Sequence, residues 1–348
     1  MNPMARLAPA RAHGSARLLR VRSLCSAAVL AVPAALAPPA AAKSVLFVRG
    51  ADRSGGFLEA GDDSERTEQL ADVDNQATFG GNHGWFELAE TLRGAGYQVS
   101  QVKESVEPGK PNGPTDGVAV DFGGAFSLDG YDVVVMGSNN ARYSPAQVDA
   151  LESFVRGGGG AIFISDANFG SDWADASDSD QPFLDRFGLV VNQDRGTYAI
   201  EQAAGEFLLP DHPLLRGVDR FDGEGVTPIT VDAAAAAAAG VTVEVLATAE
   251  GSVRRNRGPF GANQRGPATP ATAEDAVLLA AQAGAGRVVG LFDRNTFFNR
   301  NGAGTDIDRL DNRQLALNVF AYAAVPEPAS AALLGAGALL LGRRRSAD

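Results

Sequence analysis

Three short, mainly apolar runs constrain the fold of this chain more than any other feature. They are Ser44–Val48, Tyr131–Met136 with its three consecutive valines, and Ala161–Ser165. A strand that is apolar on both faces has to be covered on both faces, and such strands are typical of the parallel sheets of α/β proteins. The runs therefore predict three strands of one covered sheet.

Helical periodicity lies between and after these runs. Apolar residues recur at the spacing of one helix face in the segment 85–92, and Gly94 ends the expected helix. The alanine run 233–239 predicts a short helix, and the segment 310–323 predicts the last one. Strands that alternate with helices indicate an α/β fold with a mainly parallel sheet flanked by helices. Further strands are expected at residues 97–102, 189–191, 226–231, 241–246, 276–281 and 287–292.

The segment 144–160 carries several agreeing local signals. Ser144 is expected to cap a helix, Pro145 takes its first position, and Gln147 completes a capping box. Gly157–Gly160 then precedes the strand that starts at Ala161. A phosphate-binding loop has the reverse order, strand before loop before helix. The four glycines are therefore interpreted as a helix terminator.

The N-terminal segment, residues 1–42, carries five arginines and no acid. The apolar run 24–36 follows them, and Ala40–Ala42 offers a small-residue cleavage site before Lys43. This run is short for a membrane-spanning helix, so the segment predicts a secretory signal peptide that a signal peptidase removes. Cys25, the only cysteine, would be removed with it. A product without thiols suits an oxidising, extracytoplasmic compartment.

The C-terminal segment, residues 325–348, shows three features in a fixed order: Pro326-Glu327-Pro328, an apolar stretch over 329–342, and Arg343-Arg344-Arg345. An arginine cluster after an apolar stretch stays on the cytoplasmic side during export, so transient membrane insertion is expected. The order resembles the PEP-CTERM sorting tail of Gram-negative bacteria, which an exosortase recognises and processes. An ordinary membrane anchor is the alternative, but this stretch is short for a permanent span.

The remaining residues, 43–324, carry 22 bases and 40 acids, a net charge of −18. Nucleic-acid phosphates would be repelled by this charge, so we expect no nucleic-acid partner. The apolar fraction of 45% is that of a globular protein. The predicted organisation is a signal peptide at 1–42, one α/β domain at 43–324 and a sorting tail at 325–348.

Three blocks of this domain resemble the class I glutamine amidotransferase-like superfold. The blocks are the strand–helix–strand unit 131–165, the motif His212–Val218, and the strand Gly286–Asp293 with Asp311–Arg313 opening the last helix. The third block is most similar to the gliding-motility auxiliary-like group (DUF4350), and the ThuA-like proteins are a related branch. The resemblance implies a flavodoxin-like or amidotransferase-like three-layer sandwich.

The domain departs from amidotransferases at the catalytic positions. That family has a Cys nucleophile after a central strand and a His/Glu pair after a late strand. Here the corresponding strands lead to Asp166 and Asp293, and no cysteine remains after export. The nucleophile and its base are therefore both missing, and we expect no release of ammonia from glutamine.

Ligands of open α/β sheets bind beyond the carboxyl ends of the strands. Polar loops begin at three such ends, after Val48, Ser165 and Phe292. Their carboxylate and amide oxygens suit Ca²⁺, and the alternative is that the loops are solvated and bind no ion. The candidate ligand-binding residues are Arg49, Asp52, Asn168 and Asn295, and the candidate metal ligands are Asp166, Asp172, Asp293 and Asp306.

A hydrolase is the competing interpretation. Asp166 and Asp293 follow strands that are expected to be neighbours, and two carboxylates in one site can act as acid and base on a glycosidic bond. Carboxylates at such positions also cap helices or bind backbone amides. His83 is a further catalytic candidate or a helix-entry residue, whereas His212 is expected to be structural because a Pro-Leu-Leu segment follows it.

The sequence as a whole predicts an exported protein of the cell surface, outer membrane or extracellular matrix of a Gram-negative bacterium. Its domain is expected to be non-catalytic and to bind carbohydrate, such as exopolysaccharide, or a partner protein. The alternative function is a carboxylate-dependent hydrolase of sugar-derived material. A third function is assembly with another exported protein, which a large exposed apolar patch would favour.

Overall fold

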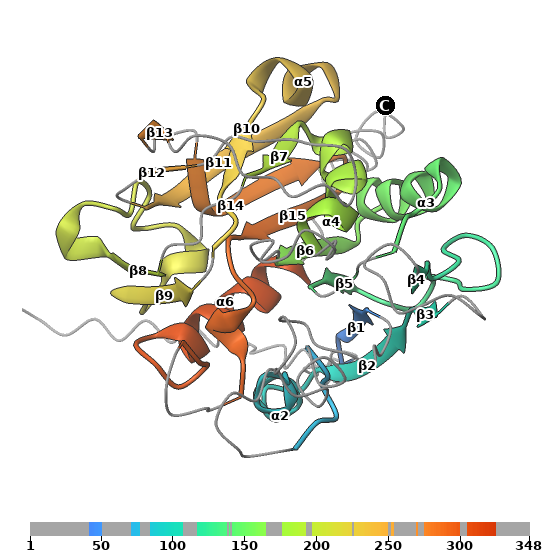
Figure 1. The fold of residues 1–348 in the computed structure, drawn as a ribbon, viewed down its shortest axis with the longest axis horizontal. Helices are drawn as coiled ribbons and strands as arrows, with labels where there is room; N and C mark the ends of the chain where they lie inside the picture. The colour runs from blue at the N-terminus through green and yellow to red at the C-terminus, as the bar shows by residue number, and fades with distance from the viewer. Residues whose placement is uncertain are drawn as a thin grey trace, which may run out of the picture. The chain divides into compact units, whose positions relative to one another are not determined.

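Buried apolar strands form the centre of the domain, as the three sequence runs predict (Figure 1). The computed structural model describes residues 42–50, 71–76, 84–106, 117–137, 139, 141–164, 176–192, 197–224, 226–249, 252–253, 269–270, 275–299 and 305–324. The predicted signal peptide and sorting tail lie outside these residues, apart from Ala42. All described residues belong to the compact unit Ala42–Asp348.

Five parallel strands form one half of a nine-stranded sheet in this part of the chain. They are β1 (Ser44–Arg49), β2 (Gln98–Lys103), β5 (Val133–Met136), β6 (Gly160–Ile164) and β15 (Gly286–Leu291). Their spatial order is β2-β1-β5-β6-β15, and every neighbouring pair is parallel. Counted along the chain, this is the 2-1-3-4-5 order of flavodoxin-like sheets.

The other half of the sheet is antiparallel. β14 (Asp275–Ala283) reaches β15 through the two-residue turn 284–285, and a turn this short permits only antiparallel pairing. β14 also pairs with β10 (Ile229–Val231) and β11 (Val241–Thr248), and β7 (Leu189–Val191) pairs with β10. The sheet is therefore mixed, with its parallel strands in the majority as predicted.

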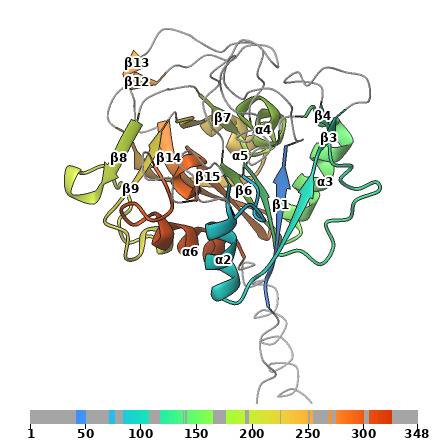
Figure 2. The same ribbon diagram turned by 60° about the horizontal axis from the view of Figure 1, so that its bottom comes forward.

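Helices cover both faces of the sheet (Figure 2). Phe47 and its alternate neighbours pack in one apolar cluster with α2 (Phe86–Gly94) and α6 (Asn312–Ala323). Leu46 points the other way and belongs to a second cluster with α3 (Pro145–Arg156) and α4 (Ala176–Leu184). The short α5 (Ala233–Ala238) adds Ala236 to this second cluster. The three-layer prediction is confirmed.

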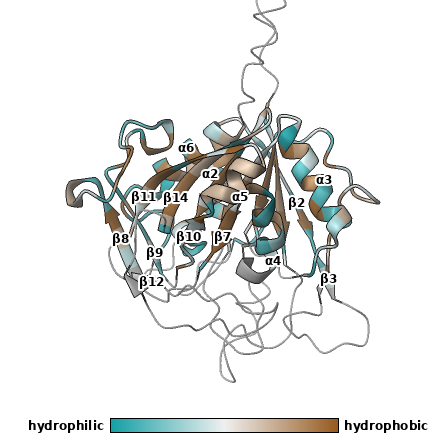
Figure 3. Cartoon of the chain, turned by 90° about the horizontal axis from the view of Figure 1, so that it is seen from above, coloured by the Kyte–Doolittle hydropathy of each residue, from teal (hydrophilic) through white to brown (hydrophobic). Residues whose placement is uncertain are grey.

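The start and end of α3 follow from local sequence signals. The backbone N–H of Gln147 donates to Ser144 Oγ, and the backbone N–H of Ser144 donates to Gln147 Oε1 at 2.8 Å, which forms the predicted capping box. Gly157 is the C-terminal cap, and β6 begins three residues later at Gly160. Hydropathy colouring shows polar residues on α3 beside apolar strands (Figure 3), which is the pattern of a helix with one buried face.

Several elements lie where the sequence predicts loops. α4 begins at Ala176, within the polar loop expected after Ser165, and β8 (Thr197–Glu201) pairs with β9 (Arg220–Glu224) outside the main sheet. Their polar residues hide the helix and strand patterns, because their partners come from distant parts of the chain.

The remaining short elements are β3 (Ser105–Val106), β4 (Gly117–Val118), β12 (Ser252–Val253), β13 (Thr269–Pro270), and the 3-10 turns η1 (Asp185–Phe187), η2 (Gln202–Ala204), η3 (Pro213–Leu215) and η4 (Asn295–Phe297).

Within the described ranges, no helix has both the length and the apolar character needed to cross a membrane. The membrane-compatible stretch predicted at 329–342 lies outside those ranges and stays a prediction.

Candidate functional site

The strand order places the carboxyl ends of β1, β5, β6 and β15 at one edge of the sheet. After β1, the chain first adds β2 on one side of β1 and then adds β5 on its other side, so the switch point of the sheet lies between β1 and β5. In flavodoxin-like sheets, ligands bind at this switch point. Arg49 ends β1, and Asn139 lies just beyond the end of β5. The carboxyl edge is therefore the first candidate site.

Arg49 is buried at this edge, with 3% of its surface exposed. Its Nη2 lies 3.6 Å from Asp72 Oδ2. The other oxygen of Asp72 accepts a hydrogen bond from Gln101 Nε2 at 3.1 Å, which fixes the carboxylate against β2. A buried guanidinium is stable only when a partner balances its charge. The predicted ligand-binding residue Arg49 is thus held by the protein itself.

Asn139 is fully buried and fixes α4 to the carboxyl edge. Its Nδ2 donates to Ser179 Oγ and to Asp180 Oδ1, both at 2.8 Å. Its Oδ1 is buried and has no hydrogen-bond partner among the described residues. Sequence reasoning did not identify Asn139, because no local motif marks a polar residue whose partners follow some 40 positions later.

Tyr143 and Glu104 form a second buried contact near this edge. The hydroxyl of Tyr143 donates to Glu104 Oε1 at 2.8 Å. Burial, together with the neighbouring Glu104 charge, raises the pKa of Tyr143 well above its usual value of 10.0. Tyr143 is therefore a fixed hydrogen-bond donor and has no basic character at neutral pH.

Asp293, the candidate catalytic and metal-binding residue after β15, is fully buried. Its Oδ2 accepts a hydrogen bond from the backbone N–H of Glu224 at 2.6 Å, and its Oδ1 accepts one from the N–H of Asn295 at 3.0 Å. These are the backbone contacts considered above as the alternative to catalysis. β6 and β15 are parallel neighbours, as predicted, but Asp166 lies outside the described residues. The catalytic pair therefore stays a prediction.

The other candidates of the late loop lie close to this junction. Asn295 begins η4, and its Oδ1 is buried and has no hydrogen-bond partner in the described part of the chain. Asp306 Oδ1 accepts the N–H of Asp308 at 2.9 Å, and its carbonyl accepts a bond from Asn312 Nδ2 at 2.8 Å. No group of three or more His, Cys, Asp or Glu residues that could hold a metal occurs in the described ranges. The candidates His83, Asp52, Asn168 and Asp172 lie outside them.

Asp222 on β9 is a buried acid that sequence reasoning missed. Its Oδ1 accepts a hydrogen bond from Asn312 Nδ2 at 2.8 Å, and its Oδ2 lies 3.0 Å from Arg309 Nε. Burial raises the pKa of Asp222 above 3.8, and the Asn312 bond and the Arg309 charge oppose this shift. These contacts join the β8–β9 hairpin to the start of α6.

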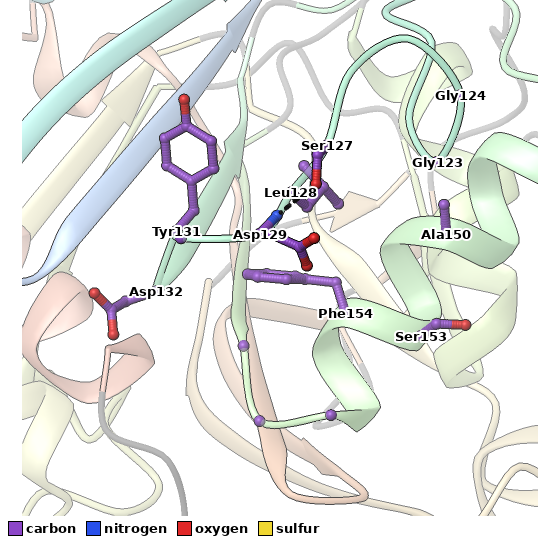
Figure 4. A pocket seen from close by; sticks show the side chains of 14 residues that line it. Gly123, Gly124, Ser127, Leu128, Asp129, Tyr131, Asp132, Ala150, Ser153 and Phe154 are labelled. Atoms are coloured by element: carbon purple, nitrogen blue, oxygen red, sulfur yellow. Dashed lines mark hydrogen bonds between the residues drawn. The ribbon is translucent and has the colours of Figure 1, made fainter.

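An open groove of about 740 Å³ lies at the opposite, amino edge of the sheet (Figure 4). One wall comes from α3 and the glycines after it, and the other comes from the loop before β5. Phe154 projects from α3 into the space between these walls. The lining residues are Gly123, Gly124, Ser127–Asp132, Ala150, Ser153, Phe154 and Gly157–Gly159.

Glycine is needed at two positions of this groove. A Cβ atom on Gly159 would lie 2.3 Å from Cζ of Phe154, so any side chain there would displace the ring. Gly123 has a φ of +74°, and a Cβ atom on it would lie 2.9 Å from Cβ of Ala150. The predicted helix terminator 157–160 therefore also shapes the groove.

The two carboxylates of the groove differ in their contacts. Asp132 is occupied, because its Oδ1 accepts from Lys43 Nζ at 2.9 Å and its Oδ2 accepts from the backbone N–H of Ser44 at 2.7 Å. Asp129 is exposed, and its carboxylate makes no hydrogen bond or ion pair with the described residues. Figure 4 shows the Asp129 carboxylate pointing towards the Phe154 ring.

The sequence did not predict this groove, because its walls are a loop and a helix terminator that look like ordinary connections. A signal was nevertheless present. The segment 123–132 combines two glycines, a serine, two aspartates and a tyrosine directly before a buried strand, and a second glycine cluster precedes the neighbouring strand.

The described structure is an α/β three-layer domain with flavodoxin-like strand order, and its sequence continues into a tail of sorting-signal type. A family model of the domain of unknown function DUF4350 matches residues 81–320, and the chain belongs to this family. The PEP-CTERM protein-sorting motif matches residues 324–346. The tail therefore indicates an exported protein that exosortase machinery processes at the cell envelope.

Several solved structures match the chain at low sequence identity. A putative ThuA-like protein from Parabacteroides merdae is 13% identical, with a TM-score of 0.41 over 81% of this chain and 90% of its own. The cytoplasmic protein STM3548 from Salmonella typhimurium is 15% identical, with a TM-score of 0.43 over 81% and 99%. The N-terminal domain of mmIFT52 is 11% identical, with a TM-score of 0.44 over 82% and 99%. No curated protein matches the chain.

Proposed function

We propose that this exported protein binds carbohydrate at the cell surface or in the extracellular matrix, through the amino-edge groove and without a chemical reaction. The groove itself carries the proposal. Its volume of about 740 Å³ lies in the range of ligand sites, which combine an apolar or aromatic surface with a few polar groups.

The lining chemistry suits a sugar ring. A pyranose has an apolar face of C–H groups and a rim of hydroxyls that need hydrogen-bond partners. Phe154 offers an aromatic face for the C–H groups, and polar groups for the hydroxyls come from Ser127, Ser153 and Asp129. The exposure of these three polar residues makes the site open, which suits a section of a polymer passing through it.

Binding is favoured over hydrolysis at this groove. Glycoside hydrolysis normally requires two carboxyl groups that act on one bond. Asp132 is engaged with Lys43 and with the backbone of Ser44, so Asp129 would act alone among the described lining residues. The contacts therefore support a site that holds a saccharide unchanged.

The test compares two serine-to-tryptophan variants in a glycan-binding assay with the chain purified after export. Ser153→Trp places a bulky ring in the groove and keeps Phe154 in its core contacts. Ser100→Trp makes the same change at an exposed position of β2, away from the groove. We expect Ser153→Trp to weaken binding at least tenfold, roughly 1.4 kcal/mol, and Ser100→Trp to bind like the wild type.

Two outcomes would contradict the proposal. One is the absence of binding to any oligosaccharide by the folded wild type. The other is undiminished binding by Ser153→Trp together with its loss in Asn139→Leu, which would move the ligand to the carboxyl edge. A thermal melt of each variant separates lost binding from lost folding.

A further inference from the structure

The Asp129 carboxylate points towards the Phe154 ring (Figure 4), and the recognition of sugar hydroxyls alone does not require this arrangement. The face of an aromatic ring carries a negative electrostatic potential. A cation that lies between such a face and a carboxylate is attracted by both. Asp129 has no such partner among the described residues, whereas the neighbouring Asp132 is balanced by Lys43.

A cation in the groove would satisfy both groups at once. An ammonium group over the ring gains a cation–π interaction of about 0.5–2 kcal/mol. The same group can donate a charge-assisted hydrogen bond to the Asp129 carboxylate. A neutral hydroxyl can donate only a weaker hydrogen bond to Asp129, and it makes no cation–π interaction with the ring.

The charge around the groove acts in the same direction. No lysine or arginine is among its lining residues, and because Lys43 balances Asp132, Asp129 supplies the net negative charge of the lining. The region 43–324 carries a net charge of −18, which attracts cations and repels polyanions over long range. Uronic-acid or sulfated polymers are therefore disfavoured as ligands of this site.

We infer that the groove selects saccharides that carry a primary ammonium group, that is, polymers containing unacetylated amino-sugar units. The ring of such a unit packs on Phe154, and its ammonium group lies between Phe154 and the Asp129 carboxylate. This inference rests on the proposed function and names the class of carbohydrate that the groove accepts.

The experiment uses four hexamers with the chain purified after export, by calorimetric titration at pH 6. Three are β-1,4-linked hexamers of glucosamine, N-acetylglucosamine and glucose, which share a backbone and differ at the second carbon. The fourth is a lysine hexapeptide, which carries the same charge without sugar rings. We expect the glucosamine hexamer to bind at least tenfold more tightly than the other three.

The matched variants are Asp129→Asn and Asp149→Asn. Both remove one negative charge, but Asp149 is an α3 residue that pairs with Arg186 and does not line the groove. Asp129→Asn should abolish the preference for glucosamine and leave the affinity for the glucose hexamer within twofold. Asp149→Asn should keep the preference.

Each failure has a distinct meaning. Equal affinity for the three sugar hexamers would overturn the ammonium inference and leave carbohydrate binding intact. Equal affinity for the lysine peptide would overturn the saccharide class. If none of the hexamers, sugar or peptide, binds the folded chain, this inference fails, and a broader glycan screen with Ser153→Trp then decides the proposed function separately.

Discussion

Buried carboxylates of this domain support the backbone at the scale of single residues. Asp293 accepts two backbone hydrogen bonds, from Glu224 and Asn295, and joins β9 to the segment after β15. An acceptor removed from a buried site leaves its donors unpaired, which costs about 1–3 kcal/mol for each. We therefore expect Asp293→Ala to lower the melting temperature by roughly 5–15 °C, because each kcal/mol shifts a domain of this size by about 2–4 °C.

The isosteric change Asp293→Asn is the control, because it keeps one acceptor oxygen and should cost less. Scanning calorimetry measures both variants. A melting temperature unchanged in Asp293→Ala would contradict the structural role. Loss of a glycoside-hydrolase activity in a normally folded Asp293→Asn protein would instead support the hydrolase alternative.

His212 links stability to pH through its ring nitrogen. Its Nδ1 accepts the backbone N–H of Leu214 at 3.2 Å, which only the neutral ring can do. Burial lowers the pKa of His212 below 6.5; the nearby Glu244 opposes this shift, and Arg287 adds to it. Because the unfolded chain binds the proton more readily, this stability is complete above pH 6.5 and is lost as the pH falls through the folded-state pKa.

We expect the melting temperature to fall between pH 7.5 and pH 5 less steeply in His212→Asn than in the wild type. The asparagine oxygen can replace Nδ1 as the acceptor for Leu214, but it does not titrate. The variant should be slightly less stable at pH 7.5, because it loses the ring contact with Tyr322. Parallel melting curves across this pH range would refute the role given to His212.

At the scale of elements, predictability follows how local the determining contacts are. The limits of α3 were predictable because its cap, Ser144, and its end, Gly157, lie within the helix's own segment. α4 was missed because its acidic sequence looks solvated, whereas Ser179 and Asp180 are buried against Asn139. The β8–β9 hairpin was missed because its stability depends on partners such as Asn312, about 90 residues later.

The same reasoning explains the candidate sites. The carboxyl edge was predictable because strand order alone brings together the ends of β1, β6 and β15. The amino-edge groove was not, because it depends on the close approach of Phe154 to Gly159 and on the contact of the loop before β5 with α3. The glycine and aspartate clusters before β5 and β6 mark these segments in the sequence, but they do not indicate that the two segments face each other across a groove.

At the scale of the whole molecule, the net charge differs between the terminal segments and the region between them. The segments 1–42 and 343–345 carry only basic charges, whereas 43–324 has a net charge of −18. A cluster of arginines resists translocation across the membrane, whereas acidic residues have little effect on it. The cationic ligand inferred for the groove agrees with the negative net charge of the region 43–324.

The tail should therefore direct the protein without supporting its fold. α6 ends at Ala323, and Ala324 caps it before the PEP-CTERM motif begins its main features at Pro326. We expect a chain truncated after Ala324 to melt within about 2 °C of the processed protein, since α6 and all of its buried residues precede the truncation, and to be released rather than retained at the envelope. Replacement of Pro326-Glu327-Pro328 by three alanines should instead leave a larger, membrane-held form, because an uncut tail keeps its apolar stretch and Arg343-Arg344-Arg345. Fractionation and intact mass of the two variants test this directly, and a truncated chain that unfolds well below the processed one would show that the tail belongs to the fold.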